Sequence, residues 1–113
     1  MTSPRRRSVL LAAATGAFLL ALSPVAQAES VRYYPVAPGY QLNVRSGPGT
    51  GYSIVRVLLA GAQVPIFCQA PGTTVTGPYG TSNIWDNIDD GEFVSDAYIQ
   101  TGSDGYIRPR CSF

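Results

Sequence analysis

The sequence of 113 residues contains no histidine and no lysine, and it has only two cysteines, one tryptophan and one methionine. Without histidine or lysine, a single chain cannot form a serine–histidine or cysteine–histidine catalytic pair or use a lysine nucleophile. A zinc site would have to combine carboxylates with the two cysteines, which is a poor set of donors. The residue types therefore exclude the commonest nucleophilic and zinc chemistry. We expect no metal and no cofactor.

Residues 1–28 have the pattern of a cleaved signal peptide. Three arginines, Arg5 to Arg7, precede an uncharged apolar run over residues 9–22, and Ala26-Gln27-Ala28 has the small-x-small pattern of a cleavage site. The run is about fourteen residues long, and a helix needs roughly 18–20 to span a bilayer. A retained anchor is the alternative. The arginines fit either the general secretory or the twin-arginine export route. We therefore predict a secreted, extracellular protein, in which association with the cell wall is an open possibility.

The charge that remains after cleavage is slightly negative. The chain from Glu29 to Phe113 has five arginines and seven acidic residues, and five minus seven gives −2. A chain without a basic surface does not attract nucleic acid, and a mildly acidic surface does not dock on anionic lipid. We therefore expect no nucleic-acid partner and no membrane partner after cleavage, and a monomer.

The two cysteines, Cys68 and Cys111, are predicted to form a disulfide. A chain of about 85 residues is one domain with a small core, and it needs additional stabilisation. Both cysteines survive cleavage, and an exported protein enters an oxidising compartment. Closing a loop of about 44 residues stabilises the fold by roughly 4 kcal/mol in the chain-entropy model. A pair of reactive thiols is the alternative.

The sequence after residue 30 favours an all-β fold. Gly and Pro recur too often for a long helix, and short runs of β-branched and aromatic residues lie between them. Residues 54–59 are the most apolar run and are predicted as a central strand. Residues 71–82 are predicted as a long loop or an irregular hairpin, and Asp89-Asp90-Gly91 as a hairpin turn before a 3-10 turn at 95–97. The other expected strands are 31–34, 40–45, 64–68, 83–88, 93–94 and 106–107.

Four sequence pieces carry a family resemblance. Leu42-Asn43-Val44-Arg45-Ser46-Gly47-Pro48 opens the series, and apolar residues over 52–66 follow. The segment from Trp85 to Ile88 and the ending from Gly91 to Ile99 complete it. Together they resemble the bacterial SH3-like (SH3b) domain, common in exported bacterial proteins. The resemblance covers residues 40–99, although Glu92-Phe93 stands where that family has Trp after Gly, and residues 71–82 are longer than its usual connection. It implies a small, partly open SH3-like β-barrel of five to seven short strands over residues 40–113, preceded by a lead-in strand at 29–39.

The resemblance also implies a non-catalytic binding module. Domains of this family often bind peptidoglycan peptides, so a cell-wall ligand is expected. Aromatic side chains offer a flat apolar face with one polar group, which suits a shallow groove for a sugar or peptide. The expected ligand-binding residues are Tyr52, Tyr79 and Trp85, with Arg45 either contacting a ligand carboxylate or pairing with an acidic neighbour. The alternatives are an exported effector or inhibitor that binds another protein, and a surface protein without a specific ligand.

The acidic residues between positions 86 and 96 leave two further alternatives open. Two carboxylates among Asp86, Asp89, Asp90, Glu92 and Asp96 could hydrolyse a glycosidic bond. The first four could instead bind calcium, although their spacing is not that of an EF-hand loop. The favoured interpretation is solvated turn residues, with Asp96 capping the short turn. We therefore expect no enzymatic activity.

Overall fold

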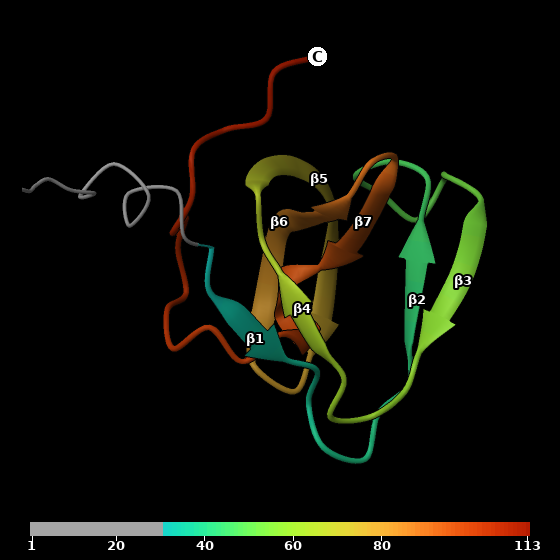
Figure 1. Cartoon of the computed structure of the whole chain (residues 1–113), viewed down its shortest axis with the longest axis vertical. Coiled ribbons are helices and arrows are strands. Elements are labelled where there is room, and N and C mark those ends of the chain that lie inside the picture. Colours follow the sequence, from blue (N-terminus) through green and yellow to red (C-terminus); the bar gives the residue numbers. More distant parts are fainter. Residues whose placement is uncertain (1–30) are drawn as a thin grey trace, which may run out of the picture. The chain divides into compact units, whose positions relative to one another are not determined.

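The computed structural model describes residues 31–113 as an all-β fold, as predicted (Figure 1). The predicted signal peptide falls on residues that lie outside this range. Within this range, seven strands precede one 3-10 turn, η2 (Asp96–Tyr98). The strands are β1 (Tyr33–Pro35), β2 (Leu42–Arg45), β3 (Ile54–Leu58), β4 (Gln63–Pro65), β5 (Cys68–Gly77), β6 (Gly80–Asp89) and β7 (Glu92–Ser95).

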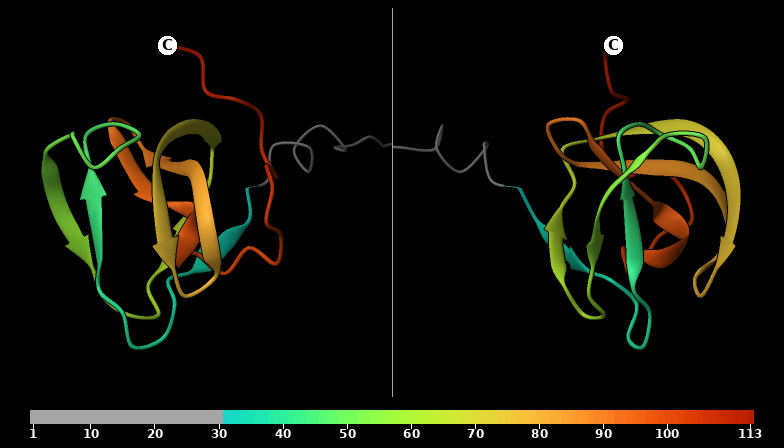
Figure 2. Two further views of the ribbon diagram at one scale, coloured as in Figure 1. Left: turned by 180° about the vertical axis from the view of Figure 1, so that it is seen from behind. Right: turned by 90° about the vertical axis from the view of Figure 1, so that its right-hand side faces the viewer.

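The strands form two antiparallel sheets. Five strands make the larger sheet in the order β3-β2-β7-β6-β5, and β1 pairs with β4 in the smaller one (Figure 2). The predicted turn at Asp89-Asp90-Gly91 joins β6 to β7, where Asp89 pairs with Glu92. Gly91 has a φ of 66°, a backbone conformation that glycine adopts without steric cost. The smaller sheet has two strands, so each of them pairs on one side only. Proline cannot donate a backbone hydrogen bond, and Pro35 and Pro65 are tolerated because both strands are edge strands.

One apolar cluster forms the core. The predicted alternation in β2 holds, because Leu42 and Val44 are buried while Asn43 is exposed. This inward face of β2 packs with aliphatic residues from β3, β4, β6 and β7 and from the segments beside them. The buried members of the cluster are Val36, Leu42, Val44, Leu58, Val64, Ile66, Ile88, Val94 and Ile99.

The prediction that residues 54–59 form a central strand is wrong. β3 lies at an edge of the larger sheet, and among the described strands it pairs only with β2, so just one of its residues, Leu58, is buried. Figure 1 shows β3 on the outer side of β2. Apolar content predicts burial, but the pairing of β2 with β7 on its other side decides which strands are interior.

Residues 71–82 resolve into the ends of two long strands. β5 and β6 form an irregular hairpin, and their register shifts between Pro71 and Val75. This outcome agrees with the second of the two predicted possibilities. By contrast, residues 106–107, predicted as a last strand, form none.

The segment from Ile107 to Cys111 is instead held by Gln69 of β5. The side-chain Oε1 of Gln69 accepts from the backbone N–H groups of Ile107 at 2.7 Å and Arg108 at 2.9 Å. The backbone of Gln69 exchanges two further bonds with this segment, since its N–H donates to Pro109 and its carbonyl accepts from Cys111, each at 2.9 Å. A side chain therefore satisfies backbone donors that a strand partner would satisfy elsewhere.

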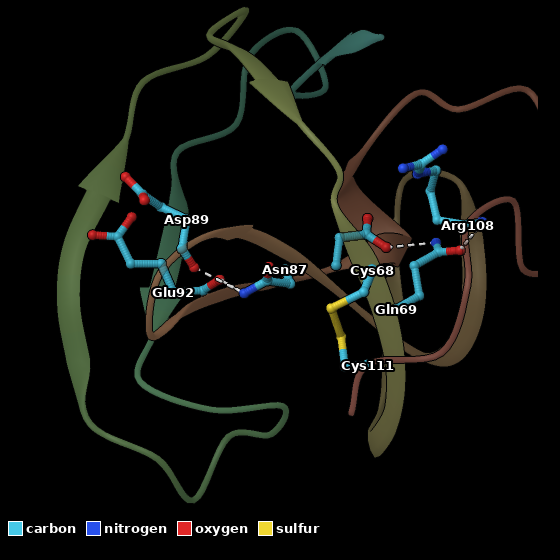
Figure 3. The surroundings of a disulfide bond; sticks show 8 residues. Cys68, Gln69, Asn87, Asp89, Glu92, Arg108 and Cys111 are labelled. Atoms are coloured by element: carbon cyan, nitrogen blue, oxygen red, sulfur yellow. Dashed lines mark hydrogen bonds between the residues drawn. A yellow bond between two sulfur atoms is a disulfide. The ribbon is translucent and has the colours of Figure 1, made fainter. Parts of the chain in front are cut away.

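The predicted disulfide joins Cys68 to Cys111, and it closes the same segment covalently. The two Cα atoms are 4.9 Å apart, within the usual range for a disulfide. Figure 3 shows the disulfide beside Gln69, with Arg108 on the far side of that glutamine. The C-terminal tail is thus fixed at residues 68 and 69, at the start of β5.

Candidate functional site

A shallow groove of about 200 Å³ lies on the face of the larger sheet opposite the core. The strand pairing shows which residues form the floor of the groove. Trp85 of β6 pairs with Ser95 of β7, and Arg45 of β2 follows the core residue Val44 by one position. Side chains of one residue and the next point to opposite faces of a sheet. The residues that line the groove include Gln41, Asn43, Arg45, Thr50, Trp85 and Tyr98.

The loop at residues 46–53 forms one wall of the groove, and Arg45 holds it in place. The guanidinium of Arg45 donates to the backbone carbonyls of Thr50 and Tyr52, each at 3.1 Å. Ser46 and Ser53 close the base of the loop through a backbone hydrogen bond of 2.9 Å. Arg45 therefore positions the wall, and both bonds from its Nη1 go to backbone carbonyls rather than to an acidic neighbour.

Two glycines allow this loop to pack closely. A Cβ on Gly47 would lie 2.5 Å from the ring of Tyr52, which covers that glycine. A Cβ on Gly72 of β5 would collide with the Pro48 carbonyl and lie 2.8 Å from Trp85. The Gly-Pro-Gly motif therefore works with a distant glycine to bring two backbones together.

Trp85 lies beneath this contact. Its side chain is 2% exposed, and its indole N–H donates to the carbonyl of Thr73 at 2.9 Å. The hydroxyl of Thr73 accepts from the backbone N–H of Thr50 at 3.1 Å, which ties the β5 bulge to the loop. Trp85 therefore forms the floor of the groove and holds its two walls, and little of its ring meets solvent.

The structure does not gather the predicted binding residues in one place. Arg45 and Trp85 line the groove, whereas Tyr52 lies outside its lining, with its ring over Gly47 and 49% exposed. Tyr79 is at the β5–β6 turn and lines a second pocket of about 270 Å³ together with Asp96. Of the four residues, two share the groove.

The sequence does not indicate Tyr98 as a groove residue. Its ring is half-buried against the core, and it meets the exposed ring of Tyr40 edge to face, with centroids 5.7 Å apart. The ending motif from Gly91 to Ile99 indicates a core role for this tyrosine. Only the position of η2 beside β6 gives it a second role at the groove.

The four acidic residues considered as calcium ligands are also separated. Asp86 is completely buried, Asp89 and Asp90 are exposed in the turn, and Glu92 forms a salt bridge with Arg56 at 2.8 Å. Within residues 31–113, no group of three or more His, Cys, Asp or Glu residues is arranged to hold a metal ion. The described part of the chain therefore does not assemble the calcium site.

Asp86 and Asp96 form a buried carboxyl pair that the sequence does not indicate. Asp86 is 0% exposed and Asp96 is 5% exposed, and within the described residues Oδ2 of Asp86 and Oδ1 of Asp96 are buried without a hydrogen-bond partner. Burial, followed by the interaction with Asp96, raises the pKa of Asp86 to about 9. Burial also raises the pKa of Asp96. The pair therefore holds at least one proton at neutral pH.

This carboxyl pair connects the second pocket to the tail. Asp86 Oδ1 accepts from the amide of Gln69 at 2.7 Å, and the same amide group holds the backbone of Ile107 and Arg108. Asp96, on the other side, lines the second pocket. Because Asp86 is completely covered, a substrate in that pocket could contact only one carboxyl of the pair.

The fold and its groove define a small all-β protein, closed by one disulfide, with a shallow surface site. Two curated proteins of Bacillus subtilis (strain 168) are similar to it. The uncharacterized protein YraI is 42% identical over 123 aligned positions that cover both chains completely. The uncharacterized protein YraJ is 47% identical over 96 positions, covering 76% of this chain and 81% of YraJ. The chain therefore belongs to the family of YraI and YraJ.

No protein-family model matches the chain, so the resemblance to SH3-like domains stays a prediction. Within residues 31–113, no helix has the length and the apolar character needed to cross a bilayer.

Proposed function

We propose that the protein is a secreted, non-catalytic binding module that recognises peptidoglycan components of the cell wall in the groove beside Trp85. The observation that carries this proposal is the groove itself. It combines exposed amide side chains, Gln41 and Asn43, with the ring of Tyr98 on a floor made rigid by Trp85. Amides donate and accept hydrogen bonds, and a tyrosine ring offers a flat apolar surface, which together suit a peptide or a sugar unit.

The size of the groove limits the ligand. At about 200 Å³ it is smaller than most sites for drug-sized molecules. It would therefore hold one sugar or one or two residues of a wall peptide. The disulfide is compatible with secretion because disulfides persist in oxidising compartments.

The proposal does not include catalysis, and the burial of one carboxyl supports that choice beside the composition. The one carboxyl pair with a raised pKa has Asp86 completely covered, so the two groups cannot flank a glycosidic bond. Incubation of cell-wall glycan with the protein should release no reducing ends. Release of reducing ends that is lost on Asp96→Asn would contradict this part of the proposal.

Sedimentation with purified cell wall tests the binding. The wild-type protein should be retained, and the double variant Gln41→Ala/Asn43→Ala should lose retention by about tenfold, since both exposed side chains would lose their hydrogen bonds to the ligand. Tyr33→Ala is the matched control, because Tyr33 is 61% exposed on β1 and lies outside the groove.

Two results would count against the proposal. Wild-type protein that is not retained at all would remove the wall as the ligand. A protein partner recovered from the culture supernatant would then favour the alternative, an exported protein-binding effector or inhibitor.

A further inference from the structure

The two edges of the larger sheet differ in how they are protected. At the β5 edge, Pro71 removes a donor, the register shifts before Val75, and the tail bonds to the backbone of Gln69. At the other edge, β3 has no proline, and within residues 31–113 it pairs with β2 alone. Its register shift lies at Val55, near the start of the strand, and leaves Arg56 to Leu58 regular. Proteins commonly protect an exposed edge strand with proline, lysine, a bulge or a covering segment.

The β3 edge also carries all four exposed large aliphatic residues of the described chain: Ile54, Val55, Val57 and Leu59, which are 51%, 48%, 47% and 66% exposed. Register shows that they share one face. Val57 pairs with Asn43 and Ile54 with Arg45, both on the face opposite the core. Val55 and Leu59 each stand beside a residue of the core face, Arg56 and Leu58, and alternation places them on the same outer face.

The charge at this edge is neutralised within the protein. Arg56 is the one charged residue of β3, and its guanidinium bonds to Glu92 at 2.8 and 3.0 Å. The chain from Glu29 to Phe113 has a formal net charge of only −2, so two copies repel each other weakly. Neither local nor overall charge opposes the approach of an identical strand.

We propose that β3 pairs antiparallel with β3 of a second copy, with Val57 of both copies on the twofold axis. This register places Val57 opposite Val57, Val55 opposite Leu59, and Arg56 opposite Leu58. It centres the ladder on the regular part of β3, away from the shift that leaves Val55 without a partner in β2. Cross-strand pairs of β-branched and aliphatic residues stabilise a sheet.

The Val57 register is more favourable than the neighbouring register of the same two strands. If Arg56 lay on the axis, the two guanidinium groups would face each other, and like charges directly opposite are destabilising. The Val57 register pairs Val55, Val57 and Leu59 with the same three residues of the partner. The interface is small, so the dimer forms only at high protein concentration, in place of the monomer expected from the sequence.

Sedimentation equilibrium over a range of concentrations tests the pairing. Wild-type protein should associate in a concentration-dependent manner, and Val57→Lys should weaken association at least about tenfold, because two lysines would face each other on the axis. Thr74→Lys is the matched control. It adds the same charge at an exposed position of β5, the protected edge, and should associate like wild type.

A charge-complementation experiment separates the proposed register from a folding defect. Val57→Lys and Val57→Glu should each be monomeric, whereas an equimolar mixture should associate again, because lysine then faces glutamate. The fluorescence of Trp85, which is buried on β6, should stay unchanged in both variants. A wild-type protein that stays monomeric would overturn the proposal. It would equally be overturned if Val57→Lys associated as strongly as Thr74→Lys, or if the mixture failed to associate.

Discussion

Two irregular segments are fastened to the same sheet by different physical means. The loop at residues 46–53 is held by close backbone packing on Gly47 and Gly72 and by the bonds from Arg45 to two carbonyls. The tail at residues 107–111 is held by the buried amide of Gln69 and by the disulfide. Packing secures the first segment, and a polar group and a covalent bond secure the second.

These two means of attachment predict which substitutions disturb each segment. A close-packed contact is sensitive to added volume, because neighbouring backbone cannot move away without strain. A buried polar contact is sensitive to the loss of one partner, because the other is left without a hydrogen bond. The candidate groove depends on the first kind of contact and the tail on the second.

The largest expected effect concerns the covalent bond of the tail. Replacing both Cys68 and Cys111 by alanine should lower the free energy of unfolding by about 4 kcal/mol, the chain-entropy value for a loop of this length. Urea unfolding measures this loss. Amide exchange should increase at Ile107 and Arg108, while the loop at 46–53 keeps its protection. Equal loss of protection in both segments would show that they are not independently fastened.

Gly72→Ala should produce the next largest effect, on the side of the groove. The added methyl group would collide with the Pro48 carbonyl, and we expect a destabilisation of about 3 kcal/mol. Thermal unfolding measures it. Gly51→Ala is the control, because Gly51 belongs to the same loop and a Cβ there meets no atom within 4 Å. Similar melting temperatures for Gly72→Ala and Gly51→Ala would contradict the packing argument.

Gln69→Ala should disturb the tail by a smaller amount, about 2 kcal/mol, because the N–H groups of Ile107 and Arg108 lose their acceptor and the disulfide still restrains the segment. Limited proteolysis by trypsin after Arg110, which is exposed in the same segment, should become faster. Gln63→Ala removes a glutamine that is exposed on β4 and should have little effect. An unchanged cleavage rate in Gln69→Ala would mean that the disulfide alone holds the tail.

The smallest effect, taken per pH unit, is the dependence of the free energy of unfolding on pH. The pKa of Asp86 is raised in the folded protein to about 9, from an ordinary value near 4, so the folded state binds more protons than the unfolded state between these values. The free energy of unfolding should therefore fall as pH rises from 5 to 8, by at most about 1.4 kcal/mol per unit. Denaturant unfolding at several pH values measures the slope. Asp86→Asn should flatten it, and a slope that persists in that variant would assign it to other groups.

Local sequence signals predicted much of the fold. Gly and Pro spacing indicated the all-β class, and the alternation over Leu42 to Arg45 indicated which face of β2 is buried. The turn at Asp89-Asp90-Gly91 and the short 3-10 turn after Ser95 followed from residue types with strong conformational preferences. The disulfide followed from there being only two cysteines. The turn and strand signals act over a few residues, and two cysteines allow only one pairing within a chain.

The candidate site was less predictable because its parts are distant in sequence. Arg45 and Trp85 were named from their motif and residue type, but the contact of Gly72 with the loop depends on the shift in β5. The pair of Asp86 and Asp96 arises because η2 packs against β6. Nothing in the composition around either residue distinguishes a buried carboxyl from a solvated one.

The sequence by itself determined the β class, the turns and the cysteine pair, since propensity and chain chemistry act locally. Only the tertiary structure decided that the most apolar strand lies at an edge, that a glutamine holds the tail, and that two carboxyls share a buried site. Strand order and burial depend on which distant segments meet, and a pattern of apolar residues does not specify the partner.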